Sequence, residues 1–253
     1  MIRSELVGDA PARVAVVEID RHERRNALDL SHLEALHDAV VAAPADGARA
    51  VVVSGRGSSF CAGADLEGVY GEGFRRALYR ALGAITDLGV PVVAAVNGPA
   101  IGAGTQLAIA CDLRVAAPAA RFAVPTARNG LAVDPWTVRR LAVLAGGGAA
   151  RALLLGADGL DAEAAHTRGL VDRLAAPDAA LDDARAWAVE IAGLAPLTLA
   201  YSKRALELLG EPEVGDAAAA ELERGFAACW TSEDFAEGRR AGAERRTPRF
   251  TGR

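Results

Sequence analysis

Two glycine-rich loops hold the residues that are best suited to bind a ligand. The first, Gly55 to Leu66 (GRGSSFCAGADL), directly follows an apolar run, and the second, Asn97 to Gly104 (NGPAIGAG), follows another and opens into a helix. Small residues let a ligand approach the backbone, and a helix N-terminus presents free N–H groups. Two such N–H groups that converge on one point would form an oxyanion hole, which stabilises negative charge on a carbonyl oxygen.

Tight turns are the alternative interpretation of these loops. Glycines between a strand and a helix need no ligand, and for either loop alone the turn is the better interpretation. The spacing does not match a phosphate-binding loop, which would need Lys before Ser or Thr, and it is not a clean dinucleotide-binding motif. The loops therefore indicate a backbone binding site only when they are taken together.

Apolar runs and helix-start signals predict the elements that must position these loops. Strands are expected at Arg13–Asp20, Ala50–Ser54 and Pro91–Val96, and the last two are apolar throughout, as in strands buried on both faces of a parallel sheet. Asp29 or Ser31 can cap a helix that runs to about Ala43. Four further elements are expected: a buried helix at Gly102–Cys111 and short strands at Leu113–Ala116, Arg121–Val124 and Gly169–Leu174. Strands separated by helical stretches indicate an α/β fold of repeated β-β-α or β-α-β units.

The last third of the chain has a different character. From Asp178 to Glu244 we find no strand candidate, and we expect helices at about 178–193, 197–209, 214–229 and 232–245. Their alanine-rich faces need a partner surface to cover them. We therefore divide the chain into a core at residues 1–190 and a C-terminal helical oligomerisation domain at residues 191–253.

Composition argues against several classes of protein. The chain has 253 residues, of which 51% are hydrophobic and only 5% aromatic, so a sizeable core must be built from Ala, Val, Leu and Ile. A net charge of −5 argues against a nucleic-acid-binding protein, which needs positive charge to attract the phosphate backbone. Cys61, Cys111 and Cys229 are an odd number without metal-ligand spacing, and the four histidines are scattered. We expect a cytoplasmic protein without a metal site or a transmembrane segment.

Taken together, the motifs resemble the crotonase superfamily, also called the enoyl-CoA hydratase/isomerase family. The matching segments follow the family's order and spacing over about residues 10–175: Arg25-Asn26-Ala27-Leu28, Phe60 to Leu66, Pro91 to Gly104, Leu107 to Arg114, Phe122 to Leu131, Leu153 to Gly156 and Gly169-Leu170-Val171. The resemblance implies a crotonase-like spiral of β-β-α repeats followed by a C-terminal α-helical trimerisation domain. It also implies acyl-CoA ligands and a homotrimer or a dimer of trimers.

The same resemblance assigns the ligand-binding positions. The N–H groups of Ala64 and Ala103 would hold the thioester oxygen, and Ala103 replaces the glycine that is usual in the family, so its methyl group would intrude beside the thioester. The contacts to coenzyme A would be made, mostly through the backbone, by Arg25, Ala62, Asp65 and Leu66. No cofactor is expected beyond the coenzyme A moiety of the ligand.

The acid/base positions depart from the family pattern. Hydratases of this family use two glutamates to activate water and to handle the proton at the α-carbon, and the matching positions here hold Gln106 and Thr126. Glutamine cannot take a proton at neutral pH, and threonine is a weak base without an activating partner. Because a positioned acid or base contributes about 10²–10⁴-fold, we expect hydration close to zero.

Asp134 admits two interpretations. It precedes Pro135, Trp136 and an apolar-patterned helix, which makes a helix N-cap the better interpretation. Some isomerising or dehalogenating members of the family carry a catalytic Asp at the matching position, so Asp134 could also shuttle a proton or act as a nucleophile. The two roles are not exclusive.

The segment from Leu131 to Leu141 (LAVDPWTVRRL) resembles one branch of the family. This branch comprises mycobacterial-type, non-catalytic fatty acyl-CoA-binding proteins linked to the supply of acyl chains for lipid synthesis. Trp136 would then line or close the acyl pocket, or it is simply a core aromatic residue. We expect a protein of fatty acid metabolism that binds long-chain acyl-CoA, with fatty acid synthesis enzymes as possible partners. The alternative is an active hydratase or isomerase that uses Asp134, and whether the chain is an enzyme stays open.

Overall fold

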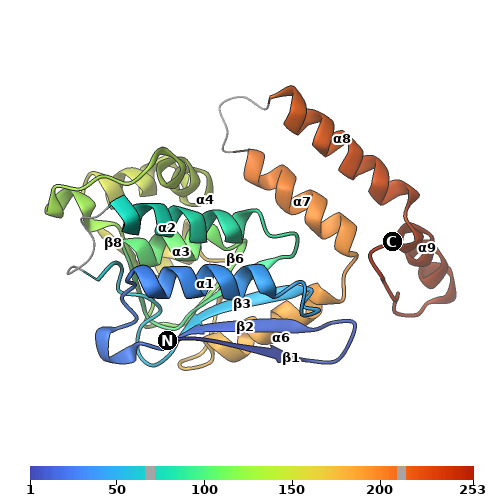
Figure 1. The fold of residues 1–253 in the computed structure, drawn as a ribbon, viewed down its shortest axis with the longest axis horizontal. Helices are drawn as coiled ribbons and strands as arrows, with labels where there is room; N and C mark the ends of the chain where they lie inside the picture. The colour runs from blue at the N-terminus through green and yellow to red at the C-terminus, as the bar shows by residue number, and fades with distance from the viewer. Residues whose placement is uncertain (66–71, 210–214) are drawn as a thin grey trace.

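A six-stranded sheet forms the centre of the computed structural model, which describes residues 1–65, 72–209 and 215–253 (Figure 1). Its spatial order is β1 (Ile2–Val7), β2 (Val14–Ile19), β3 (Ala50–Gly55), β4 (Val92–Val96), β6 (Leu113–Ala116) and β9 (Arg173–Leu174). Only β1 among these runs antiparallel to its neighbour. Every residue of β3 and β4 is buried, as their continuous apolar runs predict.

A second, three-stranded sheet lies beyond the carboxyl end of β4. It contains β5 (Pro99–Ile101), β7 (Arg121–Ala123) and β8 (Gly159–Asp161). The chain reaches β5 from β4 through Asn97 and Gly98 alone, and a Cβ atom on Gly98 would lie 2.1 Å from the Ser58 carbonyl oxygen. The turn between the sheets therefore packs directly on the first glycine-rich loop.

Helices cover both faces of the central sheet (Figure 1). On one face lie α1 (Leu30–Ala42), α2 (Glu72–Thr86), α3 (Ala103–Ala110) and, against α3, α4 (Pro135–Leu154). On the other face lies α6 (Ala180–Ala192), and α5 (Ala162–Thr167) packs beside β8 and β9. Side chains of β2, β3 and β4 alternate between the two faces, which gives two separate apolar cores.

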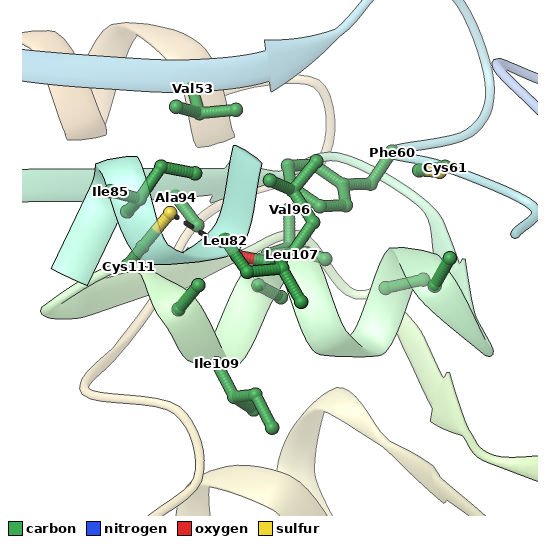
Figure 2. Close-up of a cluster of buried hydrophobic side chains, with 14 of the residues drawn as sticks. Val53, Phe60, Cys61, Leu82, Ile85, Ala94, Val96, Leu107, Ile109 and Cys111 are labelled. Atoms are coloured by element: carbon green, nitrogen blue, oxygen red, sulfur yellow. Dashed lines mark hydrogen bonds between the residues drawn. The ribbon is translucent and has the colours of Figure 1, made fainter. Parts of the chain in front are cut away.

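The larger core is filled mostly by aliphatic side chains, as the low aromatic content predicts. Figure 2 shows Val53, Ala94 and Val96 of the sheet facing Leu82 and Ile85 of α2, with α3 completing the cluster. All of these side chains are buried. This packing fixes the position of α3 relative to the sheet, and α3 begins at the end of the second glycine-rich loop.

Three helices form the C-terminal part of the chain: α7 (Pro196–Leu208), α8 (Asp216–Thr231) and α9 (Glu233–Glu244). In Figure 1 they extend away from the layers of the core. Lys203 of α7 is buried and donates to the Ile85 carbonyl (2.8 Å), to the Val90 carbonyl (3.1 Å) and to Asp112 (2.8 Å), so α7 is anchored to the core. The division at residue 190 stays a prediction, and α6, which packs on the sheet, ends at Ala192.

The expected strands and helices are present. All expected strands and helices occur within a few residues of their predicted bounds, although the strand expected at 169–174 pairs only through Arg173 and Leu174. Sequence reasoning gave no prediction for five elements: β1, β5, β8, α2 and α5. β1 is largely exposed and carries three consecutive polar residues, while β5 and β8 are only three residues long with partners 22 to 40 positions away, so local pattern alone could not reveal them.

Candidate functional site

The two glycine-rich loops lie against each other and are joined by one β-bridge onto β5. Cys61 forms a parallel bridge with Ala100: its N–H donates to the Pro99 carbonyl (3.0 Å), and its carbonyl accepts from the Ile101 N–H (2.9 Å). We call this contact, between residues 61–65 and 99–104, the loop junction. It confirms that the two loops belong to one place in the molecule.

Glycine is required at two positions of the loop junction. Gly63 has φ +103°, and a Cβ atom there would lie 2.8 Å from the Ile101 carbonyl oxygen and 3.8 Å from the Ala103 nitrogen. A Cβ atom on Gly104 would lie 2.0 Å from the Cys61 carbonyl oxygen. The two backbones therefore approach more closely than any side chain would allow.

The N–H groups of Ala64 and Ala103 both belong to this region of close contact. Leu28 donates to the Gly63 carbonyl (2.8 Å) and accepts from the Asp65 N–H (2.7 Å), a parallel bridge that directs the N–H of Ala64 away from Leu28. Ala103 is the first residue of α3, where a backbone N–H has no partner within the helix. Among the described residues, neither N–H donates to another backbone group.

The side chain of Asn26 holds the first loop through hydrogen bonds to its backbone. The sequence motif included Asn26 but did not predict this role. Asn26 is fully buried with φ +58°. Its amide donates to the carbonyls of Arg56 (2.9 Å) and Ser59 (2.7 Å), and its oxygen accepts from the Arg21 N–H (3.0 Å). Its burial and left-handed conformation show only in the structure, where Asn tolerates that conformation and brings donors as well as an acceptor.

The expected coenzyme A contacts lie around the same loop. Arg25 is exposed and its carbonyl accepts from the Ala62 N–H (3.0 Å). Asp65 is half-buried and forms an ion pair with Arg21 at 2.8 Å. Leu66 lies outside the described residues. The structure thus brings Arg25, Ala62 and Asp65 to one side of the loop junction.

A second group of polar side chains gathers at the N-terminus of α4. Asp134 caps this helix, as predicted, and accepts from the Thr137 N–H and hydroxyl. Gln106 of α3 donates from Nε2 to Thr137 Oγ1 (2.8 Å) and approaches Asp134 Oδ1 (3.4 Å). Because the Thr137 hydroxyl gives its proton to Asp134, it must accept from the NH₂ group of Gln106, which fixes the orientation of the amide.

Tyr79 of α2 completes this group, which we call the polar cluster (Tyr79, Gln106, Asp134 and Thr137). Burial and the nearby Asp134 carboxylate raise the pKa of Tyr79, while hydrogen bonding with the Gln106 side chain and the Asp134 backbone opposes that rise. The Tyr79 hydroxyl therefore stays protonated at neutral pH. Sequence reasoning did not single out Tyr79, because nothing in its local pattern distinguishes it from a helix surface residue.

Within the described residues, the side chains of two further predicted residues, Thr126 and Trp136, make no hydrogen bond with the polar cluster. Thr126 is half-buried in the short 3₁₀ helix at Pro125–Asn129, and its hydroxyl makes no hydrogen bond within the described part of the chain. Trp136 is half-buried against the larger core, and its indole Nε1 donates to Glu207 of α7 at 2.9 Å. The contact with α7 had no counterpart in the sequence analysis.

Cys61 lies in the loop junction, but its thiol is not set up to act as a nucleophile. Its thiol is fully buried, and burial raises its pKa to about 12, opposed by a hydrogen bond with the Gly63 backbone. The thiolate, which is the nucleophilic form, is therefore scarce at neutral pH. Across the described ranges no cluster of three or more His, Cys, Asp or Glu side chains could hold a metal ion.

The sequence matches the family model described as "Enoyl-CoA hydratase/isomerase" over residues 9–253. The chain belongs to the enoyl-CoA hydratase/isomerase family. It is 46% identical over 240 residues to the "Probable enoyl-CoA hydratase echA6" of Mycobacterium tuberculosis, covering 94% of this chain and 96% of that relative. It is also 32% identical to the "Crotonyl-CoA hydratase" of Syntrophomonas wolfei, over 99% of each chain.

Solved structures place the enoyl-CoA hydratase/isomerase fold over the whole chain. The crystal structure of an enoyl-CoA hydratase from Mycobacterium tuberculosis H37Rv superposes with a TM-score of 0.83 at 34% identity, over 99% of each chain. A Bacillus anthracis enoyl-CoA hydratase structure gives a TM-score of 0.87 at 28% identity. The predicted α/β crotonase fold with a helical C-terminal region is confirmed. No helix in the described ranges combines the length and apolarity that crossing a membrane requires.

Proposed function

We propose that this enoyl-CoA hydratase/isomerase family member binds long-chain acyl-CoA thioesters and lacks hydratase activity. The observation that carries the proposal is the state of Gln106. Its side chain is buried, stands where the family's hydratases carry a glutamate, and turns its NH₂ group toward Thr137 and Asp134. A carboxamide held in this way can donate and accept hydrogen bonds but cannot take up a proton from water or from carbon.

In this proposal the loop junction holds the thioester. The N–H groups of Ala64 and Ala103 would donate to the thioester oxygen, supported by the close approach of the Gly63 and Ala103 backbones and by the absence of backbone partners for both donors within the described residues. Alanine at position 103 keeps the N–H donor. Such donors polarise a carbonyl whether or not a reaction follows.

The coenzyme A moiety would lie beside Arg25, Ala62, Asp65 and Leu66. Ala62 and Asp65 belong to the first loop, and the Arg25 carbonyl accepts from the Ala62 N–H. The side chain of Arg25 is exposed, so it would be free to pair with a phosphate group of coenzyme A. The acyl chain would extend toward Trp136. A half-buried aromatic side chain packed against the larger core would favour methylene groups over water at that end.

A second function keeps support from one observation. Asp134 Oδ1 lies 3.4 Å from Gln106 Nε2, which supports a role for this carboxylate beside the position that the resemblance assigns to a catalytic glutamate. Asp134 could then serve as an acid or base in an isomerase or a hydratase. Against this stands its engagement as the N-cap of α4, which uses both carboxylate oxygens.

Crotonyl-CoA hydration separates the two functions. We expect no turnover above background for the wild type and none for Gln106→Glu alone, because residues that act as a unit are strongly non-additive. The double variant Gln106→Glu with Thr126→Glu is the change with the better chance of gaining activity. Robust wild-type hydration that is abolished by Asp134→Asn would establish Asp134 as catalytic and overturn the binding function. Hydration that survives Asp134→Asn would mean that the site lies elsewhere.

The proposal includes an assembly of three or six copies in the cytoplasm, in contact with enzymes of fatty acid synthesis. A row of tilted aromatic rings, Tyr201, Phe226, Trp230 and Phe235, lines an apolar groove of about 520 Å³ between α7, α8 and α9. Phe226 and Trp230 are 52% and 57% exposed in the single chain, a surface that a second copy would cover. A monomer at micromolar concentration by light scattering would contradict this assembly.

A further inference from the structure

Glu207 connects the C-terminal helix α7 to the first turn of α4. One carboxylate oxygen, Oε1, accepts from the indole of Trp136 at 2.9 Å, and the other, Oε2, pairs with Arg140 at 2.7 Å. Trp136 and Arg140 are four residues apart and therefore share one face of α4. Arg140 donates in turn from Nε to the Ile109 carbonyl at 3.0 Å, which extends the connection to the end of α3.

This contact is largely withdrawn from solvent. The side chains of Glu207 and Arg140 are only 15% and 12% exposed. Hydrogen bonds that involve a charged group are stronger than neutral ones, and side chains as buried as these are poorly screened by salt. Glu207 therefore holds the indole of Trp136 in one orientation.

The indole that Glu207 contacts belongs to the helix that also carries Asp134 and Thr137. Trp136 belongs to the same first turn of α4 as Thr137, which accepts a hydrogen bond from Gln106, but its indole faces Glu207 of α7. In the proposed function the acyl chain extends toward Trp136, so a rotation of the indole would change the space open to that chain without moving the backbone of either helix. The residue that controls this rotation lies 71 positions later in the chain.

Docking of α7 onto the core does not depend on Glu207. Lys203, one turn earlier in α7, is buried and makes three bonds to Ile85, Val90 and Asp112. Glu207 is thus an additional contact, and its two partners are both on α4. Loss of Glu207 should leave α7 in place and release the indole.

We propose that Glu207 is a positioning residue for Trp136 and thereby determines how long an acyl chain the site accommodates. This inference rests on the proposed function, because it assigns Trp136 to the acyl end of the ligand. It adds a specificity-determining residue from the C-terminal helices to a site otherwise built by the core. Glu207 touches neither the thioester nor the polar cluster and acts only through the indole.

The experiment measures binding of a series from acetyl-CoA to palmitoyl-CoA by calorimetry in three α7 variants. Wild type should gain about three- to fourfold in affinity per buried methylene until the pocket is filled. Glu207→Leu should weaken binding of the longest chain by about tenfold and leave acetyl-CoA within about twofold. Glu207→Gln keeps an oxygen that accepts from the indole and should stay close to wild type. Arg204→Ala is the matched control, since it removes an exposed pair between α7 and Glu221 and touches neither Trp136 nor Arg140.

Three binding results would overturn the inference. The effect of Glu207→Leu must vanish in a Trp136→Phe background, so an undiminished effect there would show that Glu207 does not act through the indole. If Glu207→Gln behaves like Glu207→Leu, the binding effect comes from losing the ion pair with Arg140 and not from releasing the indole, and the inference is wrong. Unchanged chain-length dependence in Glu207→Leu would equally contradict it.

Fluorescence of Trp136 separates this inference from the proposed function. In a Trp187→Phe, Trp230→Phe background, Trp136 is the sole tryptophan, because the chain has three. Without any ligand, Glu207→Leu should shift its emission and speed its anisotropy decay, while Glu207→Gln should not. If wild type binds all chain lengths equally, the proposed function fails. The positioning role then stands if the emission shifts with Glu207→Leu and falls if it does not.

Discussion

The loop junction and the polar cluster hold their functional groups by different means. The loop junction is made of backbone: its donors are N–H groups, and its geometry is set by bridges and by glycines that admit no side chain. The polar cluster is made of side chains from three helices, α2, α3 and α4. Only a substitution to proline removes a backbone N–H, whereas any substitution of Gln106 changes the chemistry that its side chain offers. Ligand binding and acid/base chemistry are therefore separable within one fold.

The largest effect is expected from Gly104→Ala, which tests whether the loop junction depends on backbone contact. The new methyl group would lie 2.0 Å from the Cys61 carbonyl oxygen, so the loops must separate. We expect a loss of about 3 kcal/mol in the free energy of unfolding, measured by urea denaturation, together with loss of acyl-CoA binding. Gly148→Ala in α4, where a Cβ atom meets nothing within 4 Å, is the matched control and should be neutral or stabilising.

The next largest effect is expected from Asn26→Ala, which removes the support of the first loop. The carbonyls of Arg56 and Ser59 lose their donor, and alanine is forced into a left-handed conformation. We expect a loss of about 2–3 kcal/mol in the free energy of unfolding and weaker acyl-CoA binding. The exposed Asn129→Ala should change stability by less than about 0.5 kcal/mol. Equal effects at the two positions would show that Asn26 does not support the site.

A smaller effect is expected in the polar cluster, from Asp134→Ala. Its loss removes a helix cap and also leaves the buried amide of Gln106 and the hydroxyl of Thr137 with fewer acceptors. We expect about 2 kcal/mol of destabilisation, against about 1 kcal/mol for Asp161→Ala, which caps α5 at an exposed site. Asp134→Asn retains the cap and should lie close to wild type. If the two alanine variants were equal, Asp134 would be a cap and nothing more.

The smallest effect is an expected absence of reaction at Cys61. Its pKa is raised to about 12 by burial, and a thiolate forms only as the pH approaches the pKa, so at pH 8 about one thiol in 10⁴ is ionised. Iodoacetamide should leave Cys61 unmodified in the folded protein and modify it after unfolding in guanidinium, as read by peptide mass spectrometry. Rapid modification of the folded protein would show that the loop junction opens to solvent.

The sequence predicted the parts of the site whose signals are local. Asp29 or Ser31 was expected to cap one helix and Asp134 another; the caps are Asp29 and Asp134, and each accepts from an N–H three residues later in the structure. The identities of Gln106 and Thr126 were likewise readable directly. The roles of Asn26 and Tyr79 were not, because each depends on partners from other elements, which a local pattern does not reveal.

By itself the sequence determined the elements and the chemistry each position can offer. Apolar runs placed β3 and β4 in a buried sheet, and the glycines at 63 and 104 left out the two side chains that would keep the loop backbones apart. Only the tertiary structure decided which groups meet: the bridge of Cys61 with Ala100, the bond of Gln106 with Thr137, and the hold of Glu207 on Trp136. Helix caps and strand runs are determined within a few residues of chain. The last two of these contacts join residues that are 31 and 71 positions apart, so they exist only after the cores have packed.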